Sequence, residues 1–376
     1  MVSQANAGVA GGRRAQRNIR HVLSAGPHNA RVGILALRAP RGWLGPGPVV
    51  EDVLVVARGA RVEYAGPRRE FTGDYEPEDV VRVEGFLMPG VVDRHVHIGL
   101  ADAGAVVRGG VTAVRDLGWN PERIWSLAEE SEGPFEGPLI RGVGPIVTCP
   151  GGYPSRAAWA PPGTAMEVRG ADECADAVRS ILDRSGVGTV KIALNTDAGP
   201  TLTDDELVAI CDAAAHAGAQ VTAHVQGAEQ TARAVGAGVG ELAHTPWTER
   251  LPDDLLAAMA GRVRIVSTLD IHAGGKETPE LHTALDNLSR FLGVGGAVAY
   301  GTDLGNGSIP PGIHVGEIWH LRRAGMTPEQ LLETVTFRPL AEGELADVVV
   351  LGANPLEDLN AYGSVKFVLR AGRRMR

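Results

Sequence analysis

The feature that most constrains this chain is a regular alternation of short apolar runs and helical patterns between residues 85 and 340. Eight runs have the length and the β-branched content of buried strands, and helical patterns lie between them. The runs lie at 85–97, 111–114, 139–143, 188–194, 220–224, 240–244, 264–268 and 297–303. Eight such units predict an α/β fold, a (β/α)8 TIM-type barrel, with a doubly wound open sheet as the alternative.

Two kinds of helix signal support this reading. Residues 174–182 place apolar side chains on one side of a helix. Segments 203–206 and 327–330 have the Thr-x-x-Glu/Gln pattern of capping boxes, which predicts that a helix begins at each of them.

Both ends of the chain differ from this central region. Residues 1–30 are polar, rich in Gly, Ala and Arg, and without periodicity, which predicts a disordered tail. Short strand patterns punctuated by Gly and Pro occupy 31–84 and return at 341–376. We expect these two segments to form one composite β-sandwich domain, which leaves 85–340 for the barrel.

Charge and composition narrow the range of partners. The net charge of −9 argues against nucleic acid or a membrane surface as a partner, and no apolar run is long enough to span a bilayer. Three widely spaced cysteines suit free thiols in a reducing compartment rather than a disulfide framework. We therefore expect a cytoplasmic protein that acts on a small-molecule or peptide substrate, and the sequence is compatible with a homo-oligomer.

Polar side chains with metal-binding chemistry stand where several of the predicted strands end. In a TIM-type barrel these strand ends meet at one rim, and neutral imidazole is the commonest side-chain metal ligand. The set therefore predicts a metal-binding barrel, although each histidine alone could be a hydrogen-bonded core residue and the aspartate a turn residue. The six candidate ligands are His95, His97, Lys191, His224, His244 and Asp303.

Lys191 is the most informative of the six. The chain has 33 Arg and only 3 Lys, so a lysine inside a predicted barrel strand is unusual. An unpaired buried ammonium is strongly disfavoured, all the more beside a divalent metal ion. Reaction with CO2 would convert the amine to a carbamate of charge −1, whose two oxygens can bridge two ions about 3.5–4 Å apart. The alternative is a lysine whose amine reaches solvent at the strand end.

Six motifs that contain or flank these residues together resemble the amidohydrolase superfamily, and the resemblance extends from residue 31 to the end of the chain. Within it, the prolidase-like and imidazolonepropionase-like branch has a loop similar to residues 144–153, although Tyr153 stands where that branch often has a histidine. The motifs are PGVVDRHVH at 89–97, GTVKIAL at 188–194, VTAHVQG at 221–227, ELAHTP at 241–246, YGTDLG at 300–305 and ADVVVLGANPLEDL at 346–359.

The resemblance implies a role for each candidate residue. It implies a first metal ion on His95, His97 and Asp303, a second on His224 and His244, and a carboxylated Lys191 between them. Two divalent ions, most simply Zn²⁺ given the imidazole-rich ligands, and CO2 would then be the cofactors. Asp303 would also be the catalytic residue that takes a proton from the attacking water and passes it to the leaving nitrogen.

Further residues are expected near this site. Tyr153, His272 and Arg115 are the candidate substrate-binding residues, because they stand near the predicted barrel mouth. Asp93 shares a strand face with the histidines, so we expect it either to orient an imidazole N–H or to be an ordinary sheet-end carboxylate.

The predicted function is a metal-dependent amidohydrolase that cleaves the C–N bond of a peptide or peptide-derived amide. A narrower form is a tailoring hydrolase of a peptide natural-product pathway, similar to those that remove the follower peptide of bottromycin-type precursors. A metal-dependent deaminase is one alternative, but such enzymes usually carry an acid where this chain has Gly227. A non-catalytic degenerate barrel is another, but such relatives typically lose ligands.

Overall fold

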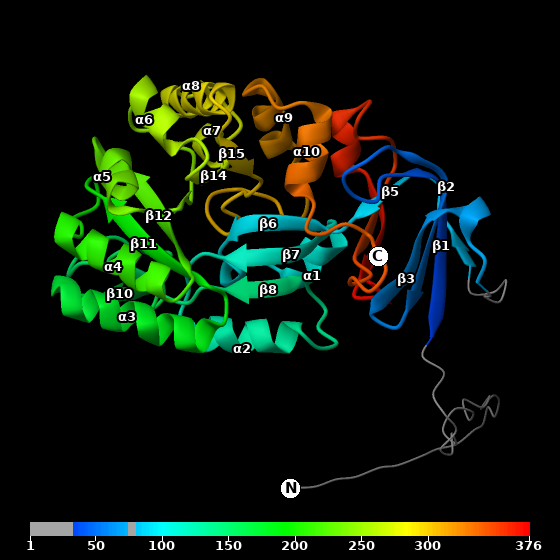
Figure 1. The fold of residues 1–376 in the computed structure, drawn as a ribbon, viewed down its shortest axis with the longest axis horizontal. Coiled ribbons are helices and arrows are strands. Elements are labelled where there is room, and N and C mark those ends of the chain that lie inside the picture. The colour runs from blue at the N-terminus through cyan, green and yellow to red at the C-terminus, as the bar shows by residue number, and fades with distance from the viewer. Residues whose placement is uncertain (1–32, 74–79) are drawn as a thin grey trace, which may run out of the picture. The chain divides into compact units, whose positions relative to one another are not determined.

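A computed structural model describes residues 33–73 and 80–376, so the tail predicted at 1–30 lies outside the described residues. Eight parallel barrel strands follow one another along the chain, as the alternation predicts (Figure 1). They are β6 (Val91–Val96), β7 (Val111–Asp116), β8 (Leu139–Gly142), β11 (Thr189–Asn195), β12 (Gln220–Gln226), β13 (Glu241–Leu242), β14 (Arg264–Val266) and β15 (Ala297–Ala299).

The third barrel strand is broken into two pieces. β8 pairs with β7, whereas the next segment, β9 (Ile146–Thr148), pairs with β11 and with the short β10 (Ala165–Glu167). Pro145 has no N–H for a ladder, and Gly144 has a φ of 93°, so the chain turns between the pieces. Beyond β15, Leu304 pairs in parallel with Val96 and closes the barrel onto β6.

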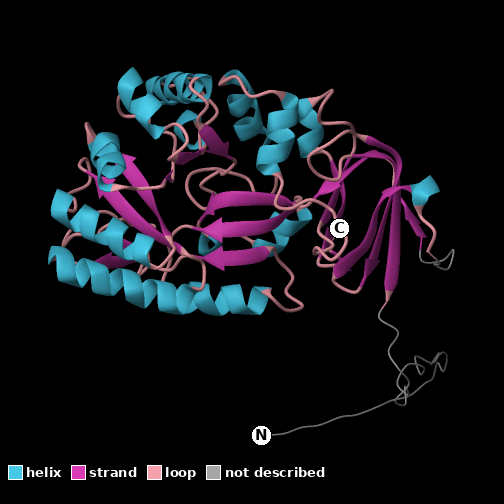
Figure 2. Ribbon diagram, in the orientation of Figure 1, coloured by secondary structure: helices cyan, strands magenta, loops and turns pink. Residues whose placement is uncertain are grey.

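Helices surround the barrel strands (Figures 1 and 2). The apolar stripe predicted at 174–182 is the buried side of α3, and both predicted capping boxes are formed, at the starts of α4 and α10. The helices are α1 (Ala103–Arg108), α2 (Pro121–Ser131), α3 (Gly170–Ser185), α4 (Asp204–His216), α5 (Gln230–Ala237), α6 (Asp253–Met259), α7 (Asp270–Ala273), α8 (Pro279–Gly293), α9 (Val315–Arg323) and α10 (Pro328–Val335).

The terminal segments form one hydrogen-bonded sheet. Its order is β18-β17-β16-β5-β1-β2-β3, with β4 on β1, so β5 joins the strands of the C-terminal segment to those of the N-terminal segment. The strands are β1 (Ile34–Gly42), β2 (Val50–Arg58), β3 (Arg61–Pro67), β4 (Val80–Arg82), β5 (Phe86–Pro89), β16 (Val348–Leu351), β17 (Val365–Arg370) and β18 (Arg373–Arg374).

The stretch 85–97, predicted as one barrel strand, is divided at Gly90. β5 belongs to the sheet of the sandwich and β6 to the barrel. A side chain at position 90 would meet the Thr112 hydroxyl at 2.1 Å, so only glycine fits where the chain passes from one sheet to the other. The exact domain boundaries stay a prediction, because residues 33–376 form one compact unit.

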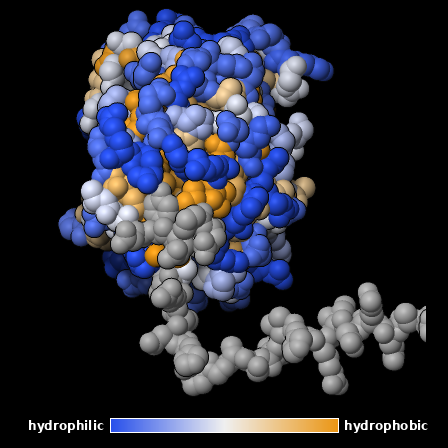
Figure 3. Space-filling view, turned by 90° about the vertical axis from the view of Figure 1, so that its right-hand side faces the viewer, coloured by the Kyte–Doolittle hydropathy of each residue, from blue (hydrophilic) through white to orange (hydrophobic). Residues whose placement is uncertain are grey.

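The sandwich has a core of its own, built from both ends of the chain. Leu37 and Val55 of the N-terminal strands pack in one cluster with Val350 and Phe367 of the C-terminal strands. On the outer face at this end, hydrophilic side chains surround a smaller hydrophobic area (Figure 3). The fold is therefore a TIM-type barrel with a small β-sandwich made from the terminal segments, as predicted. Among the described residues, no helix has the length and apolar character needed to cross a membrane.

Phe367 tests whether the C-terminal strands stabilise this core. Phe367 is 3% exposed and packs in the shared cluster, whereas Lys366 beside it on β17 is exposed. Phe367→Ala should lower the free energy of unfolding by about 3–5 kcal/mol, because it leaves a cavity. Lys366→Ala should change it by less than about 0.5 kcal/mol. Urea denaturation of both variants measures the difference, and equal effects would contradict this account of the core.

Candidate active site

All six candidate ligands line a single cavity of about 170 Å³ at the carboxyl ends of the barrel strands. Each is buried, with an exposed fraction of 8% or less. Seven further residues line the same cavity: Ile146, Tyr153, Trp159, Trp247, Ile271, His272 and Asn306.

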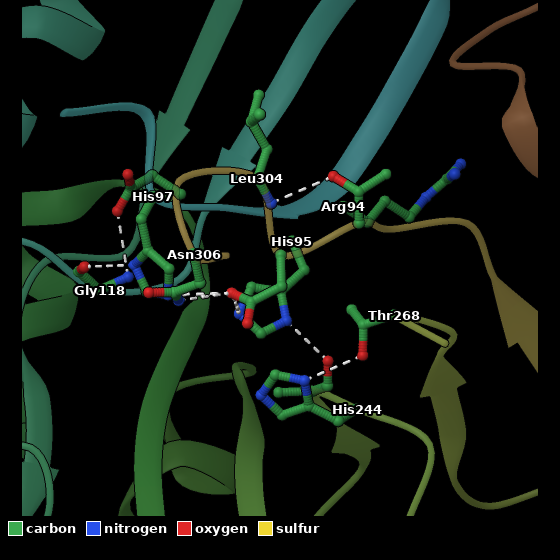
Figure 4. A network of polar contacts seen from close by, with 12 residues as sticks. Arg94, His95, His97, Gly118, His244, Thr268, Leu304 and Asn306 are labelled. Carbon is green, nitrogen blue, oxygen red and sulfur yellow. Dashed lines mark hydrogen bonds and ion pairs between the residues drawn. The ribbon is translucent and has the colours of Figure 1, made fainter. Parts of the chain in front are cut away.

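His95, His97 and Asp303 form a compact cluster. The Nε2 atoms of both histidines lie 3.3 Å from Oδ1 of Asp303, and candidate ligand atoms of the three residues lie within 4.8 Å of one another. The Nδ1 atoms of the histidines are 2.7 Å and 2.8 Å from the backbone carbonyls of Ala243 and Gly118, respectively (Figure 4). A carbonyl can only accept, so each Nδ1 carries the proton and each Nε2 is left as a ligand atom for a metal ion.

Asp93 does not orient an imidazole N–H, contrary to one of the two expectations. Its carboxylate instead accepts hydrogen bonds from the backbone N–H of His95 at 3.1 Å, and from the N–H and hydroxyl of Thr302 at 3.1 and 2.5 Å. Burial raises the pKa of Asp93 to about 7. Asp93 therefore ties the strand that carries His95 to the segment that carries Asp303.

Lys191, His224 and His244 form the other side of the cavity. Lys191 is 2% exposed, and its Nζ has no hydrogen-bond partner among the described residues. The two imidazole rings stand edge-on, with centroids 4.9 Å apart. Nδ1 of His244 lies 2.9 Å from the Thr268 hydroxyl, which leaves Nε2 as its candidate ligand atom. An unpartnered amine in a cavity lined by histidines is compatible with a ligand bound there.

Burial controls the charge of these side chains. Burial lowers the pKa of Lys191 to about 7 and that of His224 to about 3, and it holds the pKa of His244 well below the ordinary value. Burial alone would raise the pKa of Asp303, but His95 and His97 beside it hold that pKa well below its usual range. Burial alone would also lower the pKa of His97, but the Asp303 carboxylate beside it raises that pKa above the ordinary value. Imidazole nitrogens around one carboxylate are a donor set suited to a cation.

Two of the three predicted substrate-binding residues lie in the cavity. The Tyr153 ring stacks on His224 with centroids 5.0 Å apart, and the His272 ring stacks on Trp247 at 4.2 Å. Burial raises the pKa of Tyr153 to about 12 and lowers that of His272 to about 4, so both are uncharged near neutral pH. Their contact with substrate stays a prediction.

Arg115 requires a correction, because it does not line the cavity. Its guanidinium donates to Glu241 at 2.5 Å and to the backbone carbonyl of Arg94 at 3.1 Å. Glu241 is fully buried at the start of β13 and also binds Arg264. Arg115 is therefore committed to a buried ion pair and is not available to a substrate.

Sequence reasoning missed Trp247, Ile271 and Asn306. Trp247 and Asn306 each follow a candidate ligand, His244 and Asp303, by three residues. All three lie beyond the end of a barrel strand, where loops build the sites of this fold. Their position just after a predicted strand is the signal in the sequence that could have identified them.

Comparisons with known proteins show the family and the fold of this chain. The model of the amidohydrolase family matches residues 86–375. The structure of A. niger ochratoxinase has a TM-score of 0.76 at 20% identity, over 91% of this chain and 95% of that chain, which shows the fold alone. The structure of a putative prolidase from Bifidobacterium longum has a TM-score of 0.74 at 25% identity, over 91% and 94%. An imidazolonepropionase from Bradyrhizobium sp. is 39% identical over 72 residues, 19% of this chain and 17% of that protein.

Lys191→Met should stabilise the metal-free protein. The folded pKa of about 7 lies below the ordinary 10.5, so between these values the unfolded chain binds a proton that the folded protein releases. The resulting penalty is largest below pH 7 and fades as the pH rises towards 10.5. We therefore expect the variant to melt several degrees higher at pH 7 and the difference to shrink by pH 10.

Calorimetry of chelator-treated protein at both pH values measures this difference. Lys276→Met, at an exposed position, is the matched control and should leave the melting temperature nearly unchanged. A Lys191→Met protein that is less stable than the wild type at pH 7 would show that the buried amine does not destabilise the folded protein.

Proposed function

Because the chain belongs to the amidohydrolase family, we propose that it is a metal-dependent hydrolase of carbon–nitrogen bonds, acting on a peptide or peptide-derived amide. One observation carries the proposal. The His95, His97 and Asp303 cluster lies in the same cavity as the unpartnered amine of Lys191. The prolidase-like fold neighbour supports a peptide-type substrate.

The side chains would hold two divalent ions, and their imidazole-rich character favours zinc. His95, His97 and Asp303 would hold one ion, and His224 and His244 the other. The lowered pKa of Lys191 gives a substantial fraction of neutral amine at pH 7. That amine can add to CO2, forming an N–C bond and releasing one proton, and the resulting carbamate would bridge the two ions. Ions bound there would supply hydroxide near neutral pH and polarise a carbonyl.

Asp303 is suited to move the proton in this reaction. Its Oδ1 faces both histidines and accepts a hydrogen bond from Asn306 at 3.0 Å. Among the described residues no hydrogen bond or ion pair engages Oδ2, so this oxygen is available to the reacting atoms. It would accept the proton of the attacking water and deliver it to the leaving nitrogen. The aromatic side chains around it would keep bulk water away.

Asp303→Asn tests the proton transfer. It should lower kcat by about 10²-fold or more, since the amide cannot accept a proton. Activity is measured on a panel of dipeptides, N-acyl amino acids and anilides with zinc-loaded protein, and bound metal is measured separately by mass spectrometry. Asp172→Asn, at an exposed position on α3, is the control. Full activity in Asp303→Asn would refute the assigned role.

Lys191→Ala tests the carbamate. The variant should lose activity, and added bicarbonate should not restore it, whereas a short carboxylic acid such as propionate should restore part of it. Metal analysis should find two ions per wild-type chain after incubation with zinc and bicarbonate. Wild-type protein that acquires no metal under these conditions would overturn the proposed function.

A further inference from the structure

We infer that residues 152–161 form a lid over the candidate metal site, which opens to admit the substrate and is held closed by a latch, the hydrogen bond between Trp159 and Tyr153. This inference rests on the proposed function, because it concerns how a substrate reaches the ions that the site would hold.

Two aromatic side chains of this segment lie against both halves of the site. The Tyr153 ring stacks on His224, with centroids 5.0 Å apart, and the Trp159 ring lies 4.6 Å from that of His97. The Trp159 Nε1 donates to the Tyr153 hydroxyl at 3.0 Å. The side chains that cover the two halves are therefore joined to each other.

The candidate ligands are buried beneath these side chains. None of the six is more than 8% exposed, and bound ions and a carbamate would fill part of the cavity that the ligands line. A scissile carbonyl must nevertheless touch an ion to be polarised by it. Because an amide substrate is much larger than water, part of the cavity wall must move for the substrate to reach the ions.

The lid makes no hydrogen bond to the walls around it. In the described part of the chain, every hydrogen bond of residues 153–161 has its partner within residues 152–164. Pro154 is the one buried residue among 153–161. Few buried contacts and few hydrogen bonds to neighbouring elements are the properties of a segment that opens locally.

Both ends of the lid are anchored. Before it, the Gly151 N–H donates to Oε1 of Glu167 at 2.9 Å, and after it, the Pro162 carbonyl accepts from Nδ2 of Asn120 at 2.9 Å. Gly151 and Gly163 have φ values of 75° and 87°, a region that glycine enters readily. Anchored ends with glycines beside them are suited to act as hinges.

Other walls of the cavity are held from behind. The loop that carries Trp247 is fixed by the fully buried Asn287, whose Nδ2 donates to two backbone carbonyls of that loop at 3.0 and 2.8 Å. Helix α7, which carries His272, is fixed by the fully buried Glu317, which accepts from two backbone N–H groups at the start of α7 at 3.0 and 2.8 Å. The lid has no such anchor between its ends, so it is the wall that can move.

Two variants and a control test the latch with zinc as the probe. Tyr153→Phe and Trp159→Phe remove opposite ends of one hydrogen bond, and each keeps an aromatic ring. Trp319→Phe, the control, removes the hydrogen bond that the exposed Trp319 of α9 donates to Asn360. Stopped flow measures zinc release to a coloured chelator and zinc uptake by metal-free protein. Both rates should rise about fivefold in each latch variant, the effect of losing one neutral hydrogen bond, and stay unchanged in the control.

The equilibrium affinity for zinc separates a lid from a support of the ligands. A lid that opens more often speeds uptake and release by the same factor, so the Kd for zinc stays unchanged. Lost support of His97 or His224 would speed release alone and raise the Kd. Because Tyr153→Phe and Trp159→Phe break the same bond, the double variant should behave as either single variant does. Weaker affinity, additive effects or unchanged rates would overturn the inference.

Acetohydroxamate, a small ligand of zinc, tests the passage of a larger molecule. Its binding to zinc-loaded protein is followed by tryptophan fluorescence. In the wild type the observed rate should level off as the concentration rises, because opening then limits binding. The limiting rate should be about fivefold higher in the latch variants. A linear dependence at equal rates in every variant would contradict the lid.

Trypsin cleavage tests the lid in metal-free protein. Arg156 is exposed within the lid, and cleavage after it follows the population of the open form. Mass spectrometry should find this cleavage about fivefold faster in the latch variants than in Trp319→Phe. This difference in a protein that binds no zinc would refute the hydrolase and support the lid. Amide hydrolysis with equal cleavage and equal zinc rates in all variants would do the reverse.

Discussion

The hydrogen bonds that close the barrel between its first and last strands determine where the cluster of His95, His97 and Asp303 forms. The Asp303 N–H donates to the His95 carbonyl at 2.8 Å, and the His97 N–H donates to the Leu304 carbonyl at 2.7 Å. Asp303 itself has a φ of 61°, a conformation that non-glycine residues rarely adopt and that is common at functional sites. Closure thus brings residues more than 200 positions apart into one cluster, and the Asp93 carboxylate reinforces it from inside.

Much of the fold could be predicted because its signals are local. Periodicity identified the barrel strands and the buried side of α3, and the capping boxes identified the starts of α4 and α10. Which sheet a strand joins is not a local property. Residues 85–97 read as one apolar strand, yet the chain changes sheet at Gly90, and only the packing of Thr112 against that glycine shows why.

The difference between local and non-local signals also explains which residues of the candidate site were predicted correctly. The six candidate ligands were predictable because each stands on a barrel strand or at its end, and all six line one cavity. Arg115 was assigned to the cavity because the sequence around it gives no sign of its ion pair. Its partner, Glu241, is 126 residues away. For Asp93, sequence indicated the correct strand face but not the partner, which is Thr302 on the far side of the closure.

The charge of the cavity follows from the same contacts. Burial lowers the pKa of Lys191 to about 7 and that of His224 to about 3, which disfavours a proton on either group. Burial alone would also lower the pKa of His97, but the Asp303 carboxylate beside it raises that pKa above the ordinary value. A proton that Asp303 stabilises on His97 would have to leave before Nε2 of His97 could bind an ion. Metal binding at this cluster would therefore be coupled to proton release.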